Sequence, residues 1–307
     1  MNSADAHRAA NRFADAVQVL QKARVRAVTS TEKMQLHCKL ARTHNGAGEH
    51  YRLEGQLEKS ALEFQSAETE LTKALELAET NDTGLMSQKN VRLQHYFNAN
   101  GKYKLNPEQN LEGLRTARQQ CQEVLERSLA CLEWPSGKAR TSEDSAKMSA
   151  LLFGKSQGVK DPEAGAAKAT AALIKHELAF ILENRPEGEE AILLPERVKQ
   201  LKSAFEFYKS AEQNREGPLK AMTQSRLVGL LLKLGDVEQA LSYLQTASRF
   251  YTQNTDGQRL DILETIIREF QCVENLSAQQ KEAIVQIRSD VTNAQAQLDA
   301  SAKPQVV

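Results

Sequence analysis

The densest group of side chains that could do chemistry lies between residues 37 and 50, where the chain reads HCKLARTHNGAGEH. It contains His37, Cys38, His44 and His50, and histidine and cysteine are the usual zinc ligands. On a helix, His37 and His44 are about 10 Å apart along the axis, because each residue rises by about 1.5 Å. That separation is too large for one shared ion, and Cys38 points about 100° away from His37 around the helix. No C-x-x-C or H-x-x-x-H pair accompanies them, so we predict no metal site here.

Two further motifs lack the partners that catalysis would need. His176-Glu177 has no second histidine at the spacing of the zinc-binding H-E-x-x-H motif. The segment GKSQG at 154–158 has a Lys-Ser pair but lacks the upstream glycine of a phosphate-binding loop. We therefore predict no catalytic residues and no cofactor, and we expect that the protein is not an enzyme.

The elements that must position these residues are predicted to be helices. Of the 307 residues, 40% are hydrophobic and 5% aromatic, and the chain has only 15 glycines and 7 prolines. Ala, Leu, Gln, Glu and Lys abound, and all of them favour helices. No sustained alternation of Val, Ile, Thr or Tyr indicates a strand. The predicted fold class is all-α.

The charge balance bears on the choice of partners. Forty basic residues match forty acidic ones, so the formal net charge is zero. Proteins dedicated to nucleic acids usually carry a basic surface, because phosphate neutralisation supplies most of their affinity. We therefore expect no nucleic-acid partner. No apolar run approaches the roughly 18 residues of a membrane span, so no membrane span is predicted.

Cysteine usage and the N-terminus indicate the compartment. The four cysteines are scattered, which is typical of a reducing environment where thiols act as small apolar residues. The first 30 residues are rich in Ala and Arg and resemble a mitochondrial transit peptide, but Asp5 and Asp15 are acids that such peptides avoid. We expect a cytoplasmic protein with a structural first helix, and the mitochondrial matrix is the alternative.

A helical hairpin is predicted over residues 221–254, which include LLLKLGDVEQALSYLQTA. Leu227, Leu231 and their neighbours recur at helical spacing and form one apolar face. Gly235 can adopt the left-handed conformation that ends a helix, and Asp236 can cap the next one. Small residues, Ala240 and Ala247, would let the two helices approach closely on either side of Leu244.

A second hairpin with the same spacing is predicted over residues 42–79. In both hairpins, similar residue types lie four positions before a central glycine and five, nine and twelve positions after it. In this copy Gly55 is the central glycine, and the residues at those offsets are Tyr51, Ser60, Phe64 and Ala67. Gly48 lies three positions before Tyr51.

These two hairpins resemble the tetratricopeptide repeat (TPR) family, with its L-G-x-x-Y and A-x-x-x-F elements. The chain departs from the family pattern at four positions. His44 and Gln224 stand where the family often has Trp, and Thr72 and Thr252 stand where a proline would close the repeat. The resemblance implies antiparallel helix hairpins stacked as a TPR-like α-solenoid.

The remaining segments divide the chain into two helical arrays. We predict arrays at 1–133 and 166–300, a flexible linker with a short helix at 134–165, and a disordered tail at 301–307. Within the first array, a helix over about 85–98 is expected to lead into a loop, NANGKYKLNP, at 98–107.

The last helix, 277–300, has two readings. Ile284, Ile287, Val291, Ala294 and Leu298 recur at alternating spacings of three and four residues. Such a narrow stripe suits the cap of a solenoid, which is our preferred interpretation, and it also resembles a coiled-coil seam through which chains could oligomerise.

The resemblance further implies that a partner peptide or helix binds the concave face lined by the first helix of each repeat. One TPR subclass grips a carboxylate with paired Asn and Lys side chains, and its positions would here be Asn45 and Glu49. Glu49 would repel a carboxylate, so this subclass is disfavoured. The other residues expected to face a partner are Arg42, Arg52, Met222, Arg226 and Lys233.

Our leading functional hypothesis is therefore a noncatalytic protein-interaction scaffold or adaptor. The loops at 80–107 and 134–165 are expected to form adaptable edges of its binding surface. Two alternatives stay open from the sequence: an all-α enzyme or small-molecule binder without a familiar motif, and a helical-repeat nucleic-acid binder.

Overall fold

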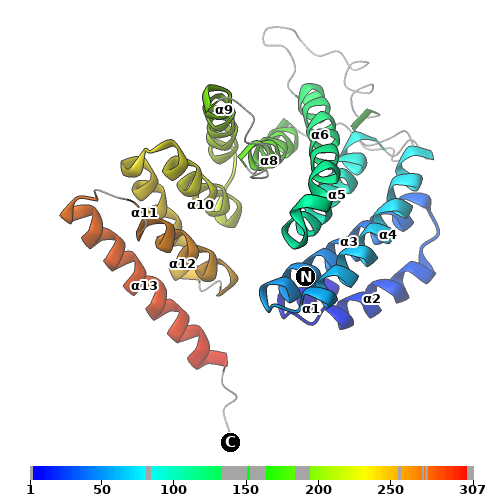
Figure 1. The fold of residues 1–307 in the computed structure, drawn as a ribbon, viewed down its shortest axis with the longest axis horizontal. Helices are drawn as coiled ribbons and strands as arrows, with labels where there is room; N and C mark the ends of the chain where they lie inside the picture. The colour runs from blue at the N-terminus through cyan, green and yellow to red at the C-terminus, as the bar shows by residue number, and fades with distance from the viewer. Residues whose placement is uncertain are drawn as a thin grey trace, which may run out of the picture. The chain divides into compact units, whose positions relative to one another are not determined.

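The structure, a computed structural model, describes residues 3–80, 84–132, 151–152, 164–183, 194–254, 257–271, 273 and 276–302. Every regular element longer than one turn in these ranges is an α-helix (Figure 1), which confirms the all-α prediction. The helices are α1 (Ser3–Ala9), α2 (Phe13–Arg26), α3 (Ser30–Leu53), α4 (Leu57–Thr80), α5 (Leu85–Leu105), α6 (Pro107–Leu132), α8 (Ala164–Glu183), α9 (Leu194–Gln213), α10 (Gly217–Leu234), α11 (Val237–Asn254), α12 (Gly257–Gln271) and α13 (Ala278–Ala302).

The chain divides into two compact units. Unit 1 contains residues 1–167 and 186–188, and unit 2 contains residues 168–185 and 189–307. In each unit, helices that follow one another in sequence pack as neighbours.

Some predicted segments lie outside the described residues. These include nearly all of the predicted linker at 134–165 and its GKSQG segment. The predicted tail at 301–307 is described only at its start, where α13 extends to Ala302.

Local signals place several helix ends where the sequence predicts them. The Thr29 hydroxyl accepts a hydrogen bond from the Glu32 N–H at 3.1 Å, and the Glu32 carboxylate accepts one from the Thr29 N–H at 3.0 Å. This reciprocal pair satisfies two N–H groups that a helix start leaves without partners. Ser277 and Gln280 form the same capping box at the start of α13, with distances of 2.9 and 3.2 Å.

The N-terminal segment forms two helices where one was expected. α1 and α2 are separated around Asn11, which has a φ of 54°. Asparagine tolerates this left-handed conformation better than most residues with side chains, so the chain can turn there. Both helices belong to unit 1, and α2 packs on α3.

The two predicted hairpins end their first helices with the same turn. Gly55 and Gly235 have φ values of 75° and 80°, in the left-handed region where glycine is least strained. In each turn, the N–H of the next residue reaches back five positions, from Gln56 to Tyr51 at 2.8 Å and from Asp236 to Leu231 at 2.9 Å. These are the hydrogen bonds of a Schellman cap.

Small residues lie at the contact between the paired helices. Ser60, Ala67, Ala240 and Ala247 are all 0% exposed. The Ser60 hydroxyl also donates a hydrogen bond of 2.7 Å to the Gly48 carbonyl on α3, so its polar atom is satisfied inside the contact.

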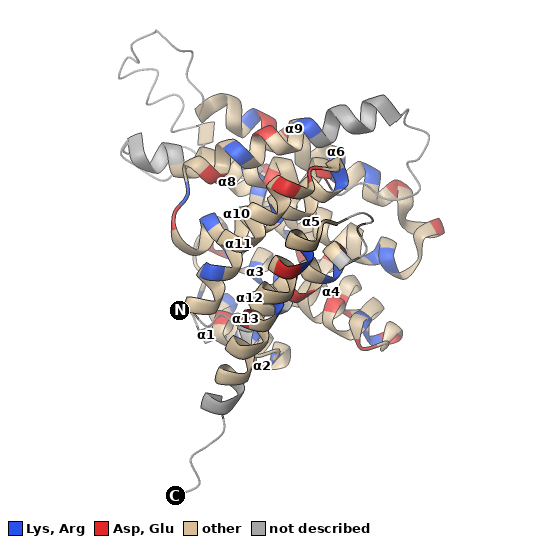
Figure 2. Ribbon diagram, turned by 90° about the vertical axis from the view of Figure 1, so that its left-hand side faces the viewer, with Lys and Arg blue, Asp and Glu red and all other residues tan. Residues whose placement is uncertain are grey.

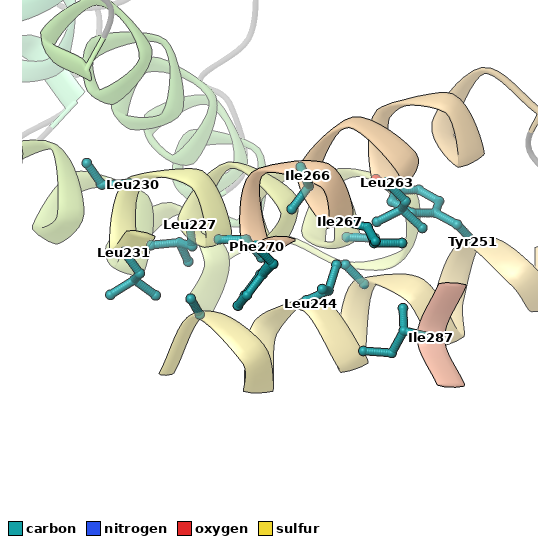
Figure 3. Close-up of a cluster of buried hydrophobic side chains, with 14 of the residues drawn as sticks. Leu227, Leu230, Leu231, Leu244, Tyr251, Leu263, Ile266, Ile267, Phe270 and Ile287 are labelled. Atoms are coloured by element: carbon teal, nitrogen blue, oxygen red, sulfur yellow. The ribbon is translucent and has the colours of Figure 1, made fainter. Parts of the chain in front are cut away.

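Among the described residues, the largest buried apolar cluster belongs to unit 2, and Figure 3 shows its central side chains. Leu227 and Leu231 of α10, Leu244 of α11 and Phe270 of α12 are each at most 2% exposed. Burying one such side chain contributes about 1.5–3 kcal/mol.

The final helix packs on this cluster through one stripe. α13 contacts α11 and α12, and its buried residues are Ile284, Ile287, Val291 and Ala294. These are four of the five residues in the predicted stripe, and the fifth, Leu298, is partly buried against the same cluster.

One prediction for unit 1 is wrong. The segment 98–107 was expected to form a loop, but α5 continues through it to Leu105 and α6 begins at Pro107. Asn98 and Gly101 both have a low intrinsic helix propensity. Within unit 1 both residues make contacts with α4 that favour the helix, as described below.

Candidate functional site

In unit 1, α3 and α5 lie side by side and run in the same direction. The Asn45 amide donates a hydrogen bond of 3.2 Å to the Gln94 carbonyl, and farther along both helices Lys104 contacts Glu49 at 3.0 Å. We call the surface formed by α1, α3 and α5 the unit 1 face. All four residues predicted to meet a partner in the first hairpin are on α3.

Asn45 is one of those four, and it is 8% exposed. Its side-chain oxygen accepts a hydrogen bond of 3.0 Å from Asn98, whose second N–H donates to the Phe64 carbonyl at 2.7 Å. The two amides therefore join α3, α4 and α5, and the Asn45 side chain is engaged inside unit 1.

The Phe64 ring fills the space that two glycines leave. A Cβ atom on Gly48 would lie 2.9 Å from the ring, and one on Gly101 would lie 2.3 Å from it. Real Cβ atoms do not approach other atoms this closely, so the positions on α3 and α5 require glycine unless the ring moves. Sequence reasoning identified Gly48 and Phe64 but missed Gly101, which lies 37 residues after Phe64 in the chain.

Glu49 and Arg52 form a bidentate ion pair at the end of the unit 1 face. Both guanidinium–carboxylate distances are 2.8 Å, and Lys104 adds a third contact at 3.0 Å. Hydrogen bonding from Arg52 and, secondarily, from Lys104 lowers the pKa of Glu49 to about 2, against the opposing effect of burial. The two cations exceed the carboxylate by one charge, so this cluster is positive.

Arg42 is exposed on α3, and no ion pair of its side chain occurs among the described residues. Its charge acts on Arg8 of α1, whose pKa is lowered by burial and next by Arg42. Burial raises the pKa of Cys38, one turn before Arg42, to about 11, and nearby cations only partly oppose that shift. Cys38 is thus a neutral thiol near positive charges and is not activated as a nucleophile.

The three histidines around the 37–50 segment each contact a different carboxylate. His37 lies 2.5 Å from Glu70, His44 lies 2.7 Å from Glu63, and His50 lies 3.2 Å from Glu54. No group of three potential metal ligands occurs among the residues that the structure describes.

In unit 2, α8 and α10 also run in the same direction. His176, Phe180 and Glu183 of α8 contact Thr223, Arg226 and Lys233 of α10, in that order, as contacts of 3.2, 4.8 and 2.8 Å show. Farther along, α12 packs on α10. We call the surface formed by α8, α10 and α12 the unit 2 face.

The three residues predicted to meet a partner in the second hairpin are on α10. The Arg226 guanidinium is exposed and lies 4.8 Å from the centre of the half-buried Phe180 ring, a cation–π contact. Lys233 donates to the Glu183 carboxylate at 2.8 Å, and Met222 is half-buried.

Two carboxylates surround Gly229 on the unit 2 face. A Cβ atom there would lie 3.8 Å from the Glu269 carboxylate and 3.9 Å from that of Glu183. Glu183 is only 5% exposed and also accepts a hydrogen bond of 3.1 Å from the Tyr208 hydroxyl. The face therefore combines an aromatic ring, a cation and carboxylates over three neighbouring helices.

A buried polar cluster beneath this face was not predicted. The Thr223 hydroxyl donates to the Leu219 carbonyl at 3.0 Å, so its lone pairs accept from Arg215 at 2.8 Å and from His176 at 3.2 Å. His176 must then carry a proton on Nδ1 to make its bond.

Arg215 is the unusual member of that cluster. It is 6% exposed, and its Nη2 atom has no hydrogen-bond partner. Burial lowers the pKa of Arg215, while the nearby Glu177 charge opposes the shift. In the sequence, Arg215 lies in the NREGP turn, and nothing in that turn indicates burial.

The comparisons with known proteins do not identify a family. No protein-family model matches the sequence, and no curated protein shows significant similarity to it. Among the described helices, none combines the length and apolar character needed to cross a membrane.

Proposed function

We propose that the protein is a noncatalytic scaffold that binds segments of partner proteins on the unit 1 and unit 2 faces. The observation that carries the proposal is the parallel arrangement of α8 and α10, which presents Phe180, Arg226 and Lys233 on neighbouring helices. Partly exposed aromatic and arginine side chains are enriched in protein-interaction sites.

A TPR-like solenoid is the finer architecture that we propose for both units. The shared Schellman turns at Gly55 and Gly235 support it, as do the buried small residues at equivalent positions of the paired helices. The packing of α5 on both α3 and α4, and of α12 on both α10 and α11, is the neighbour pattern expected of stacked hairpins. In this proposal, α13 is the cap of the array.

The lengths of the helices favour a divergent repeat. α3 and α4 each contain 24 residues, whereas a whole TPR unit of two helices has about 34. α10 and α11, with 18 residues each, are closer to the family pattern. The proposal therefore concerns helical hairpin stacking, and it does not require regular TPR spacing.

Site-specific photo-crosslinking tests the proposal. A benzophenone amino acid would replace Arg226 on the unit 2 face, and in a control it would replace Gln245, an exposed residue of α11. In a lysate of the source cells, we expect the probe at position 226 to form discrete protein adducts that the probe at 245 does not form. Equal adducts from both positions, or none from position 226, would contradict the proposed role.

A further inference from the structure

We propose that the unit 1 face binds an acidic segment of a partner protein. This inference rests on the proposed function and specifies the chemistry of one partner. It follows from the distribution of charge among the helices of unit 1 and from the cations that remain without a counter-charge.

The charges of unit 1 are distributed unevenly among its helices; Figure 2 colours the Lys, Arg, Asp and Glu residues on the ribbon. α5 has four Lys or Arg residues and no Asp or Glu, and α3 has four basic residues against two acidic ones. The adjacent α4 has the opposite balance, with six Glu against two Lys. A chain with zero net charge thus places an excess of cations on α3 and α5.

Part of this excess is neutralised within unit 1. Lys102 of α5 pairs with Glu68 of α4, and Arg92 of α5 pairs with Glu79 of α4 at 3.4 Å. These ion pairs cross between the two helices and contribute to their packing. They do not involve the exposed cations of α3, which therefore stay available to bind a partner.

Two of the remaining cations are on α3. Lys39 and Arg42 are exposed, lie three residues apart, and form no ion pair within the described part of the chain. Both charges act on the Cys38 thiol, which places them in one neighbourhood.

Arg8 of α1 extends this group. Asp5 contacts its Nη2 atom, while its buried Nη1 atom has no hydrogen-bond partner. The charge of Arg42 acts on Arg8, so Arg8 adds to the positive field near Arg42, and Asp5 offsets part of it. Because the exposed Arg42 guanidinium can hold a carboxylate by two parallel hydrogen bonds, it suits the side chain of Asp or Glu.

The cluster of Glu49, Arg52 and Lys104 ends the same face with one further positive charge. Arg42 and Arg52 are separated by about 15 Å along α3, because ten residues each rise about 1.5 Å. An acidic segment of about five extended residues, or about ten helical residues, would span this distance.

The same cations could attract a nucleic acid, but the face favours a protein. Nucleic-acid affinity comes from many phosphate contacts made together. Here the Glu49 carboxylate, which Arg52 and Lys104 hold, lies between Arg42 and Arg52 along α3 and interrupts the row of cations that successive phosphates would need. Individual Asp and Glu side chains can be spaced to meet Arg42 and to avoid Glu49.

A binding experiment with the full chain tests this proposal. The probes are three fluorescent 15-mers: a Glu-Ala-rich peptide, a peptide of the same length with Lys in place of Glu, and a single-stranded RNA. Anisotropy at low salt should show binding of the acidic peptide only. Tighter binding of the RNA, or no binding of the acidic peptide, would overturn the inference.

Matched double variants locate the binding surface. Lys39→Glu with Arg42→Glu should weaken binding of the acidic peptide at least tenfold. The control, Lys22→Glu with Lys59→Glu, changes two exposed lysines of α2 and α4 and makes the same change in net charge. It should alter affinity less than twofold, and an equal loss in both variants would refute a site on the unit 1 face. Circular dichroism melts would establish that each variant is folded.

The crosslinking result separates the two proposals. If position 226 forms specific protein adducts while the acidic peptide fails to bind, the scaffold role stands and only the acidic-partner inference falls. If the crosslinking test also fails, the scaffold proposal itself is wrong.

Discussion

The Asn98 side chain on α5 donates a hydrogen bond of 2.7 Å to the Phe64 carbonyl on α4. The same amide donates to the Asn45 side chain on α3 at 3.0 Å, so one residue holds three helices. Asn98 is 3% exposed, and water cannot easily replace these bonds.

Replacing this amide should destabilise unit 1. Asn98→Ala would leave the buried Asn45 oxygen without its partner and remove a bond to the Phe64 carbonyl, at a cost of about 1–3 kcal/mol. Asn90→Ala is the matched control, because Asn90 is an exposed asparagine of the same helix. Urea unfolding should show a change below about 0.5 kcal/mol for this control. Equal effects of the two substitutions would remove the structural role assigned to Asn98.

The sequence predicts those parts of the fold that local chemistry determines. The capping boxes at Thr29 and Ser277 and the left-handed Gly235 each depend on residues within five positions in the chain. The end of α5 depends on distant residues instead. Asn98 and Gly101 favour a loop locally, and contacts with Phe64, more than 30 residues earlier, override that preference.

The sequence predicts only part of the candidate site, because the other contacts join residues that are distant in the chain. Helical spacing places Arg42, Asn45 and Glu49 near one another on α3, but it does not show which side α5 covers. The structure buries Asn45 under α5 and leaves Arg42 exposed. The Arg226 contact with Phe180 joins residues 46 positions apart, and no local pattern indicates it.

Two glycines should respond oppositely to the same substitution. Gly101→Ala would place a methyl group 2.3 Å from the Phe64 ring, and the resulting overpacking should cost about 1–3 kcal/mol. Gly113→Ala on α6 would meet no atom within 4 Å, so it should stabilise by about 0.5–1 kcal/mol through helix propensity. Urea unfolding of both variants gives the comparison. Stabilisation by Gly101→Ala would show that Phe64 does not fill this space.

The Glu49 ion pairs should contribute a pH-dependent part of the stability. The pKa of Glu49 is about 2 in the folded protein and 4.5 for an unperturbed glutamate, so the folded state favours the ionised form. This contribution is complete above pH 4.5 and is lost as the pH falls through 2. Because Glu49 is partly exposed, we expect it to be about 1 kcal/mol.

A single variant checks this dependence. The difference in unfolding free energy between the parent protein and Glu49→Gln should be constant from pH 5 to 7 and should shrink as the pH approaches 2. Urea titrations at several pH values measure it. A difference that grows toward acid would reverse the predicted sign.

An apolar replacement of the buried Arg215 is expected to destabilise the protein less than an apolar replacement of Thr223, which accepts its hydrogen bond. Arg215→Met removes a guanidinium that is 6% exposed and has one unbonded nitrogen, and the Thr223 hydroxyl keeps its bond to Leu219. Burying a charge is costly unless it is paired and hydrogen-bonded, and a Met side chain of similar size would remove that cost. Thr223→Val, in contrast, would remove the hydrogen-bond acceptor of Arg215 and should cost about 2–3 kcal/mol. In thermal unfolding, the double variant should recover most of the stability that Thr223→Val loses, because it no longer contains the buried charge. Strict additivity of the two changes would contradict the coupling between Arg215 and Thr223.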